Sequence, residues 1–197
     1  MSTAALPISG AVLADRLLPR RLAVDAALVV GGAALTAVLA QVEIPLWPVP
    51  ITGQTLAVLL TGATLGATRG AASMLLYAVA GLVLPIYSDH ASGFAVLLGP
   101  TGGYIVGFIL AAAFTGWLAQ RQVERRLVRG LLAFVAGSVV VFIVGVPWLA
   151  VVLHLSAPEA IAAGFTPFIV GGIVKAAIAA GVLRGAWALV ARADRTH

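Results

Sequence analysis

The sequence predicts an all-α integral membrane protein, a compact bundle of six transmembrane helices with the N-terminus and the C-terminus in the cytoplasm. The first reason is composition, because 61% of the 197 residues are hydrophobic and only 10% are charged. A soluble domain carries about 25% charged residues, so this chain has too little polar surface to face water. The second reason is a series of long apolar runs, and the third is the placement of basic residues between them.

Six apolar runs mark the expected helices, since a membrane-spanning helix needs about 20 mostly apolar residues. The expected spans cover residues 22–40, 54–66, 70–85, 101–120, 131–153 and 167–191. The second and third are short, which predicts that they are tilted or cross where the bilayer is thin. The first and second are separated by VEIPLWPVPITG, whose prolines cannot continue a helix.

Basic residues alternate between the two sides of this map. Arginines precede the first span, lie between the second and third and between the fourth and fifth, and follow the last. The other three loops contain no Lys or Arg. By the positive-inside rule, both termini are therefore cytoplasmic. Arginines at the membrane surface attract anionic lipid headgroups, so the net charge of +5 points to the lipid bilayer and not to nucleic acid.

The sequence lacks the usual catalytic patterns. Its histidines, His90, His154 and His197, do not have metal-ligand spacing, and the absence of cysteine excludes thiolate chemistry. The glycines of LGPTGGY match neither a P-loop nor a dinucleotide-binding motif. We therefore expect no enzyme, no ATPase site, no metal and no bound cofactor.

The last span contains Lys175, the only lysine in the chain, among isoleucines, valines and alanines. An ionisable residue inside a span costs about 2.5–3.5 kcal/mol on insertion scales and usually marks a functional site. Gly171 and Gly172 lie on the same helical face, which leaves room beside the ammonium. We expect this face to receive an anion. The alternative is a lysine whose stem snorkels to the membrane surface and binds nothing.

The outer loops offer further pocket residues. The Pro-rich loop carries Trp47 and leads into Gln54 and Thr55, which can form hydrogen bonds. The glycine-rich loop can bring backbone amides close to a ligand, because glycine tolerates unusual dihedral angles. From these loops the candidates are Trp47, Gln54, Thr55, Tyr87, Gly102, Gly103 and Tyr104.

Four segments of the chain carry a family resemblance. They are AQVEIPLWPVPITGQTLAVLLTGATLG (40–66), LLGPTGGYIVGF (97–108), GVPWLA (145–150) and PFIVGGIVKAA (167–177). With these segments, the chain from about Arg21 to Leu189 resembles the BioY family, the biotin-binding S components of energy-coupling factor (ECF) transporters.

The resemblance implies a six-span protein of a prokaryotic plasma membrane that binds biotin in a pocket opening outward. Such a subunit has no ATPase of its own and assembles with a transmembrane coupling subunit and two ABC-type ATPase subunits. Lys175 would supply positive charge in a dry pocket, most simply to the biotin carboxylate, and Gln54, Thr55 and the loop amides would meet the ureido edge. The bicycle would be walled by Trp47, Tyr87, Tyr104, Trp148 and Phe168.

This chain departs from the family at Gly172, because the family motif usually has an acidic residue three positions before the lysine. We expect the missing acceptor to come from Glu43, Asp89 or the Gln54 side-chain carbonyl. Otherwise the ligand is another small vitamin-like carboxylate bound by the same kind of S component. A third possibility, from a different class, is a membrane scaffold without transport activity, in which Lys175 only snorkels.

The resemblance also implies that small residues of the first span meet the coupling subunit. The candidates for this interface are Ala23, Ala27, Gly31, Ala33 and Ala37. Such spacing also arises by chance in a helix rich in Ala and Gly. For the whole chain we expect a cytoplasmic lead over 1–21, one transmembrane substrate-binding domain over 22–192 and a cytoplasmic tail over 193–197.

Overall fold

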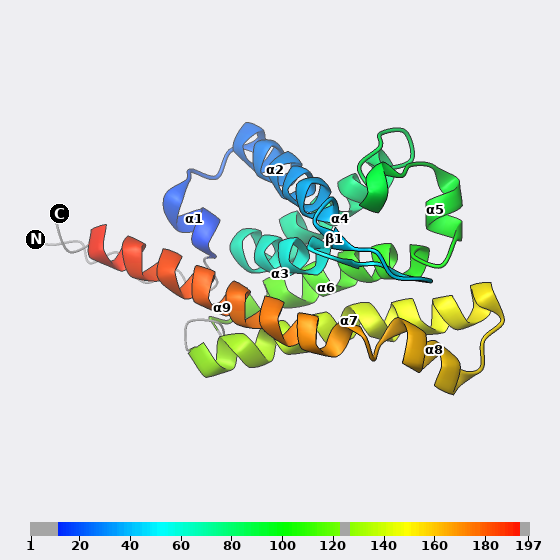
Figure 1. Ribbon diagram of the computed structural model, residues 1–197. Helices are drawn as coiled ribbons and strands as arrows, with labels where there is room; N and C mark the ends of the chain where they lie inside the picture. The colour runs from blue at the N-terminus through cyan, green and yellow to red at the C-terminus, as the bar shows by residue number, and fades with distance from the viewer. Residues whose placement is uncertain (1–11, 123–126, 194–197) are drawn as a thin grey trace, which may run out of the picture.

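The structure is a computed structural model that describes residues 12–122 and 127–193, so most of the expected lead (1–21) and tail (193–197) lies outside it. The described residues are almost entirely helical (Figure 1). The elements are α1 (Leu13–Leu17), α2 (Leu22–Ala40), β1 (Glu43–Ile44), β2 (Ile51–Thr52), α3 (Gln54–Leu65), α4 (Ala67–Ala80), the 3-10 turn η1 (Ser88–His90), α5 (Phe94–Leu98), α6 (Gly102–Gln120), α7 (Leu127–Leu153), α8 (Ala157–Gly164) and α9 (Phe168–Ala193).

Each of the six predicted ranges overlaps one long or medium-length helix, with ends that differ by a few residues. Within the described part of the chain, four helices are long and apolar enough to cross a membrane, namely α2, α6, α7 and α9. Helices α3 and α4 have only 12 and 14 residues. At 1.5 Å per residue they are shorter than a hydrocarbon core of about 30 Å. The structure therefore describes a multi-pass membrane protein, and the count of six crossings stays a prediction.

A glycine follows the last residue of both α3 and α4. Gly66 ends α3 and begins α4 with a φ of 88°, a conformation that favours glycine, so the chain turns within one residue. Helix α4 ends at Ala80, whereas we expected a span to residue 85. Gly81 follows this end, and the Tyr87 ring packs against it so closely that a Cβ there would clash.

Helix α6 lies at the centre of the bundle, between the α3–α4 pair and α7 (Figure 1). Its apolar segment is 61% buried within the protein, against 17–28% for the other three long helices. Small residues allow the close crossings that membrane bundles require. Gly107 faces the backbone of Val141 in α7, and Gly116 faces the backbone of Ala67 at the start of α4. The outward faces of α2, α7 and α9 remain apolar, as a lipid-facing surface requires.

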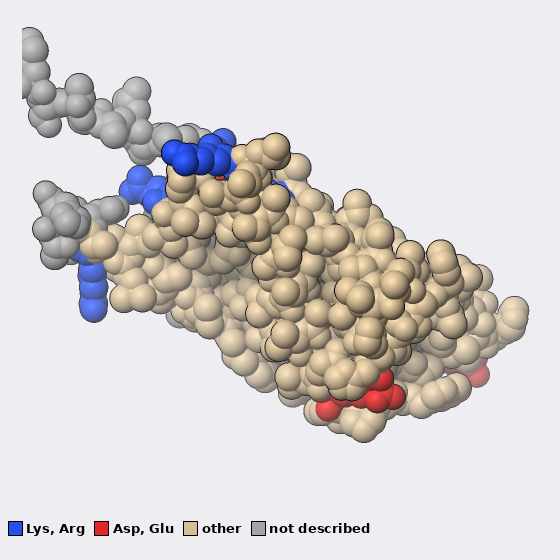
Figure 2. Space-filling model, turned by 90° about the horizontal axis from the view of Figure 1, so that it is seen from above, with Lys and Arg blue, Asp and Glu red and all other residues tan. Residues whose placement is uncertain are grey.

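The two ends of the bundle differ in charge. Figure 2 shows basic side chains at the end where α1 lies, whereas acidic side chains appear at the opposite end of the same face. At the basic end, Arg69 of α4 links four elements. Its guanidinium donates to Asp15 of α1 at 2.6 Å, to Asp25 of α2 at 2.9 Å and to the Leu65 carbonyl of α3 at 2.9 Å. Arg20 completes the group with a second ion pair to Asp15 at 2.9 Å.

This charge cluster predicts acid sensitivity. Burial raises the pKa of Asp15, but the hydrogen bonds and positive charges of Arg20 and Arg69 outweigh burial and bring the pKa below its ordinary value. A carboxyl with a lowered pKa in the folded state stabilises the protein above its ordinary pKa of about 4, and that contribution is lost as the pH falls through the folded pKa.

We therefore expect Asp15→Asn to cost about 1–3 kcal/mol near neutral pH and to flatten the loss of stability below about pH 4. Thermal unfolding in detergent across this pH range measures both effects. Asp25→Asn is the matched control and has a smaller effect, because the Asp25 side chain is 39% exposed whereas that of Asp15 is 6% exposed. Equal effects of the two substitutions would contradict this account of the cluster.

Candidate functional site

The hairpin of β1 and β2 presents a free carbonyl to the interior. Glu43 pairs with Thr52 and Ile44 with Ile51. The Gly53 amide donates to the Val42 carbonyl at 2.8 Å, so the next pair, Glu43 and Thr52, is a non-hydrogen-bonded pair of the antiparallel ladder. In such a pair the backbone groups point away from the partner strand. The Thr52 carbonyl can therefore accept a hydrogen bond from another element.

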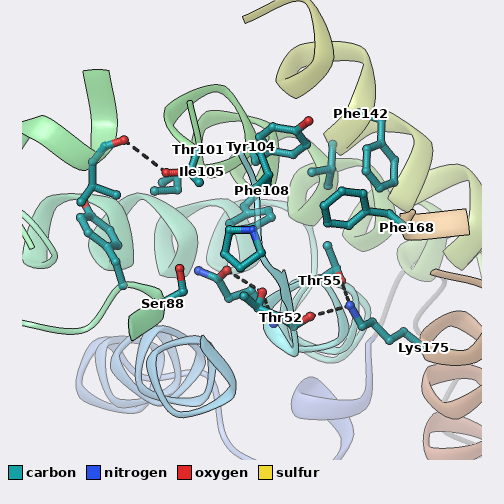
Figure 3. Close-up of a pocket in the computed structure, with 16 residues that line it drawn as sticks. Thr52, Thr55, Ser88, Thr101, Tyr104, Ile105, Phe108, Phe142, Phe168 and Lys175 are labelled. Atoms are coloured by element: carbon teal, nitrogen blue, oxygen red, sulfur yellow. Dashed lines mark hydrogen bonds between the residues drawn. The ribbon is translucent and has the colours of Figure 1, made fainter. Parts of the chain in front are cut away.

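That donor is Lys175 of α9. Its ammonium donates to the Thr52 carbonyl and to the Thr55 hydroxyl, the latter at 3.1 Å (Figure 3). Lys175 thus turns toward the hairpin and the first turn of α3, and its neighbour Ala176 is fully buried. This placement agrees with an inward-facing lysine and not with one that snorkels along the outside of the helix. Both acceptors are neutral, so they leave the positive charge of the ammonium uncancelled.

A chain of hydrogen bonds continues from Thr52 into the core. The Thr52 hydroxyl donates to the Gln54 side-chain carbonyl at 2.6 Å, and the Gln54 amide donates to the Tyr77 hydroxyl at 2.6 Å. The Tyr77 hydroxyl in turn donates to the Ile86 carbonyl at 3.2 Å. This network fixes the orientation of Gln54 and commits its side-chain oxygen to Thr52.

Lys175 borders a cavity between the hairpin and helices α3, α6, α7 and α9. The empty space between these elements, including the part that is open to solvent, is about 520 Å³. One polar edge contains Lys175, Thr52, Thr55 and Gln54, whereas most of the remaining wall is apolar. The full lining is Val49, Pro50, Thr52, Gln54, Thr55, Tyr87, Ser88, Val96, Thr101, Tyr104, Ile105, Phe108, Val141, Phe142, Phe168 and Lys175.

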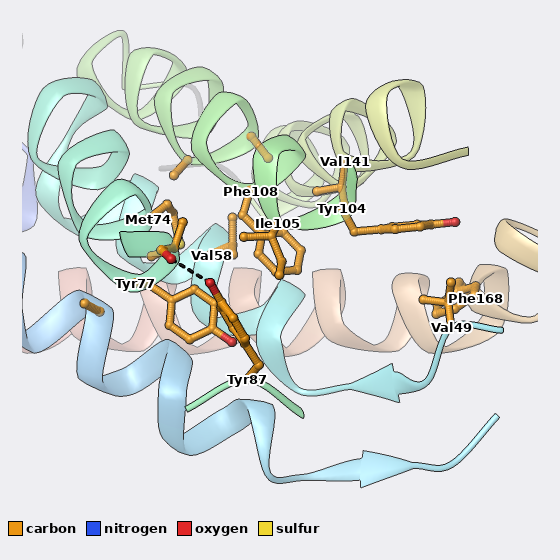
Figure 4. Close-up of a cluster of buried hydrophobic side chains, with 14 of the residues drawn as sticks. Val49, Val58, Met74, Tyr77, Tyr87, Tyr104, Ile105, Phe108, Val141 and Phe168 are labelled. Carbon is orange, nitrogen blue, oxygen red and sulfur yellow. Dashed lines mark hydrogen bonds between the residues drawn. The ribbon is translucent and has the colours of Figure 1, made fainter. Parts of the chain in front are cut away.

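Aromatic rings form one wall of the cavity. Tyr104 stacks on Phe168 with ring centroids 6.3 Å apart, and Phe142 meets Tyr104 edge-on at 6.2 Å. The Tyr104 hydroxyl donates to the Gly164 carbonyl at 2.9 Å, which fixes the ring between α6 and α8. Figure 4 shows that this wall continues into the buried cluster around Phe108, Ile105 and Val141.

The loop after α4 closes another side. Tyr87 is 1% exposed, and its hydroxyl donates to the Ala78 carbonyl at 2.6 Å. Burial raises the pKa of the Tyr87 hydroxyl, so this group remains a neutral donor at physiological pH. Gln41 fastens the same loop to α2, because its side-chain amide donates to the Tyr87 carbonyl at 2.9 Å and its side-chain oxygen accepts from the His90 amide at 3.2 Å.

The structure brings six of the predicted pocket residues together around the cavity. They are Gln54, Thr55, Tyr87, Tyr104, Phe168 and Lys175. Their contacts with a ligand stay predictions, but their convergence from four separate segments of the chain gives those predictions a common geometry.

The other predicted pocket residues lie outside the cavity lining. Trp47 is 84% exposed at the tip of the hairpin. Gly102 and Gly103 are buried, and a Cβ on them would strike the Leu97 backbone and the Trp148 side chain, respectively. They therefore permit close packing at the start of α6. Gly171 and Gly172 are half-buried. A Cβ on Gly171 would approach Ile51 of the hairpin at 3.8 Å, whereas a Cβ on Gly172 would meet no atom within 4 Å.

Sequence reasoning missed the apolar part of the wall. Phe108, Val141 and Phe142 lie within long apolar helices, where nothing in the sequence separates a cavity-facing residue from a lipid-facing one. Ser88 and Thr101 lie in loops and offered a weak signal as polar residues beside glycine-rich turns.

The small residues predicted to meet the coupling subunit lie on two different faces of α2. Ala23, Ala27 and Gly31 are exposed. Ala33 is buried and Ala37 packs against the buried cluster, so these two residues face the bundle and not a partner. The prediction for Ala33 and Ala37 therefore needs correction, because helical rotation separates two sets of small residues that the sequence presents as one stripe.

No group of three His, Cys, Asp or Glu residues suited to a metal ion occurs in residues 12–122 and 127–193.

The fold and the site define a class, a multi-pass helical membrane protein with an internal cavity bordered by a single lysine. The chain belongs to the BioY family, whose model matches residues 10–192. It is 34% identical to biotin transporter BioY2 of Lactococcus lactis subsp. cremoris over 146 residues, which make up 74% of this chain and 80% of the relative.

Other relatives show the same degree of similarity. The probable biotin transporter BioY of Pyrococcus horikoshii is 39% identical over 147 residues, 74% of this chain and 85% of the relative. Biotin transporter BioY of Thermotoga maritima is 37% identical over 148 residues, 75% of this chain and 86% of the relative.

A solved structure shares the fold. The crystal structure of the S-component for biotin from an ECF-type ABC transporter matches with a TM-score of 0.72 at 22% sequence identity. The match covers 81% of this chain and 88% of that chain.

Proposed function

We propose that this protein takes up biotin as the substrate-binding S subunit of an ECF-type importer, and that it is not an enzyme. It captures biotin at the outer side and delivers it inward together with a coupling subunit and two ABC-type ATPase subunits. The names of the BioY relatives and the fold of the biotin S-component support this assignment. The observation that carries it is the uncancelled positive charge of Lys175 at the polar edge of an otherwise apolar cavity.

The geometry suggests how biotin binds. Lys175 lies beside Thr55 in the first turn of α3, so a ligand carboxylate there meets both an ammonium and the positive end of a helix dipole. The aromatic wall of Tyr104, Phe142 and Phe168 offers an apolar surface to the bicycle. Gln54, whose amide has one further N–H to donate, is our candidate for the ureido carbonyl.

Substitution of Lys175 tests this binding mode. Lys175→Met keeps a chain of similar length without the charge, and we expect it to weaken biotin binding at least about 30-fold, because truncating one partner of a buried charge pair costs about 2–5 kcal/mol. Isothermal titration calorimetry of the purified protein in detergent measures the change. Arg184→Ala, on an exposed face of the same helix, is the control and leaves affinity unchanged. If Lys175→Met bound biotin with the affinity of the wild type, Lys175 would not be a ligand-binding residue.

The same titration separates the alternatives. A biotin importer prefers biotin and desthiobiotin to lipoate, since lipoate lacks the ureido group. Tighter binding of lipoate would favour an S component for another vitamin-like carboxylate. A membrane scaffold would be stabilised by none of the three ligands, and Lys175→Leu would then change nothing.

We also propose six membrane crossings, with both termini in the cytoplasm of a prokaryotic cell. Since the chain has no cysteine, single cysteines report the orientation directly. In intact cells, a membrane-impermeant maleimide should label His154→Cys, and it should label Arg192→Cys only after permeabilisation. Both side chains are exposed in the structure. The opposite pattern of labelling would place the termini outside.

For the coupling subunit, we propose the exposed face of α2 with Ala23, Ala27 and Gly31. Gly31 and Gly181 of α9 are both exposed, and a Cβ added at either would meet no atom within 4 Å, so we expect both sites to accept a large residue. We expect Gly31→Phe to bind biotin normally but to lose ATP-driven uptake in vesicles that contain the whole importer. Gly181→Phe, the matched control, keeps both activities. Full uptake by Gly31→Phe would exclude this face as the interface.

A further inference from the structure

Glu43 carries an acceptor without a donor. It lies in β1, and its Oε2 atom is buried although the residue as a whole is only half-buried. No described residue donates a hydrogen bond to this oxygen. A buried acceptor without a partner costs about 1–3 kcal/mol, and more when it is charged. The unpaired Glu43 oxygen is therefore unfavourable for folding alone, and its position needs another explanation.

The register of the hairpin places Glu43 next to the cavity. Glu43 stands directly opposite Thr52, which lines the cavity. Side chains of such a pair lie on the same face of the hairpin, with Cβ atoms about 4.5–5.5 Å apart. The Thr52 hydroxyl is committed to Gln54 at 2.6 Å, so it does not satisfy the carboxylate. Glu43 therefore lies on the hairpin face that carries the Thr52 side chain, next to a lining residue although not itself part of the lining.

The other acceptors along this edge are already engaged. The Thr52 carbonyl and the Thr55 hydroxyl accept from Lys175, and the Gln54 side-chain oxygen accepts from Thr52. The described cavity lining contains no Asp or Glu. Asp89 and Glu159, the other acidic residues of the expected outer segments, are exposed and outside the lining. The edge thus offers donors to a ligand, and the Glu43 Oε2 atom is a buried acceptor for which the described residues provide no donor.

We propose that Glu43 is a ligand-binding residue whose carboxylate accepts a hydrogen bond from a ureido N–H of the bound molecule. This inference rests on the proposed function and adds to it a determinant of specificity. Hydrogen bonds to an ionised acceptor are about twice as strong as neutral ones. A site that contains such an acceptor discriminates against carboxylates without an N–H donor, because binding them leaves the buried oxygen unpaired.

A cycle of two proteins and two kinds of ligand tests the proposal. The proteins are the wild type and Glu43→Gln, and the ligands are biotin and biotin methylated on either ureido nitrogen. We expect Glu43→Gln to weaken biotin binding roughly 10- to 100-fold. Methylation of the nitrogen that faces Glu43 should cost affinity in the wild type and much less in Glu43→Gln. Asp89→Asn is the matched control and should bind biotin as the wild type does.

The outcomes distinguish this inference from the proposed function. If the wild type binds biotin tightly and Glu43→Gln binds it equally well, the inference fails and the proposed function stands. If a well-folded wild type binds no biotin, both fail. If Glu43→Gln does not fold, the affinities of the wild-type protein for biotin and for the two methylated forms still test the inference. Equal affinity for biotin and for both methylated forms would then overturn the role of Glu43.

Discussion

The hydrogen bonds from the Lys175 ammonium to the Thr52 carbonyl and the Thr55 hydroxyl join the last long helix to the hairpin and to α3. The site depends on this connection. An ammonium inside an apolar helix is unfavourable unless it finds acceptors, and the hairpin supplies one because its register leaves the Thr52 carbonyl outside the ladder. The neutral acceptors stabilise the ammonium without cancelling its charge, which remains available to an anionic ligand.

The rest of the bundle keeps this edge in place from two directions. At the cavity end, the chain of hydrogen bonds from Thr52 through Gln54 to Tyr77 orders the start of α3, and the rings of Tyr104 and Phe168 order the opposite wall. At the other end, Arg69 connects α4 to α1, α2 and α3. The basic end is thus joined by ion pairs, whereas the Lys175 ammonium at the cavity end is bound, among the described residues, only by neutral acceptors and keeps its charge for a ligand.

The sequence predicted the six longer helices of the described chain, α2, α3, α4, α6, α7 and α9, from their hydrophobic runs. The cost of a charge in an apolar helix pointed to Lys175, which the structure places at the border of the cavity. The sequence did not predict how each helix is rotated about its axis, and so it did not predict which side chains face the cavity. Phe142 lines the cavity and Ala33 faces the bundle, yet each lies in a run of apolar or small residues whose faces differ little in composition. Gly102 and Gly103 were expected to expose amides to a ligand. The structure places them outside the cavity lining, where they allow α6 to pack closely against Leu97 and Trp148. Glycine permits both uses, and only the tertiary structure separates them.

The most direct test is an experimental structure of the protein with biotin bound. The account predicts biotin in the cavity between Lys175 and the aromatic wall, with the Lys175 ammonium within hydrogen-bond distance of a polar atom of the ligand. Biotin bound elsewhere, or biotin in the cavity with Lys175 still engaged only by Thr52 and Thr55, would contradict it.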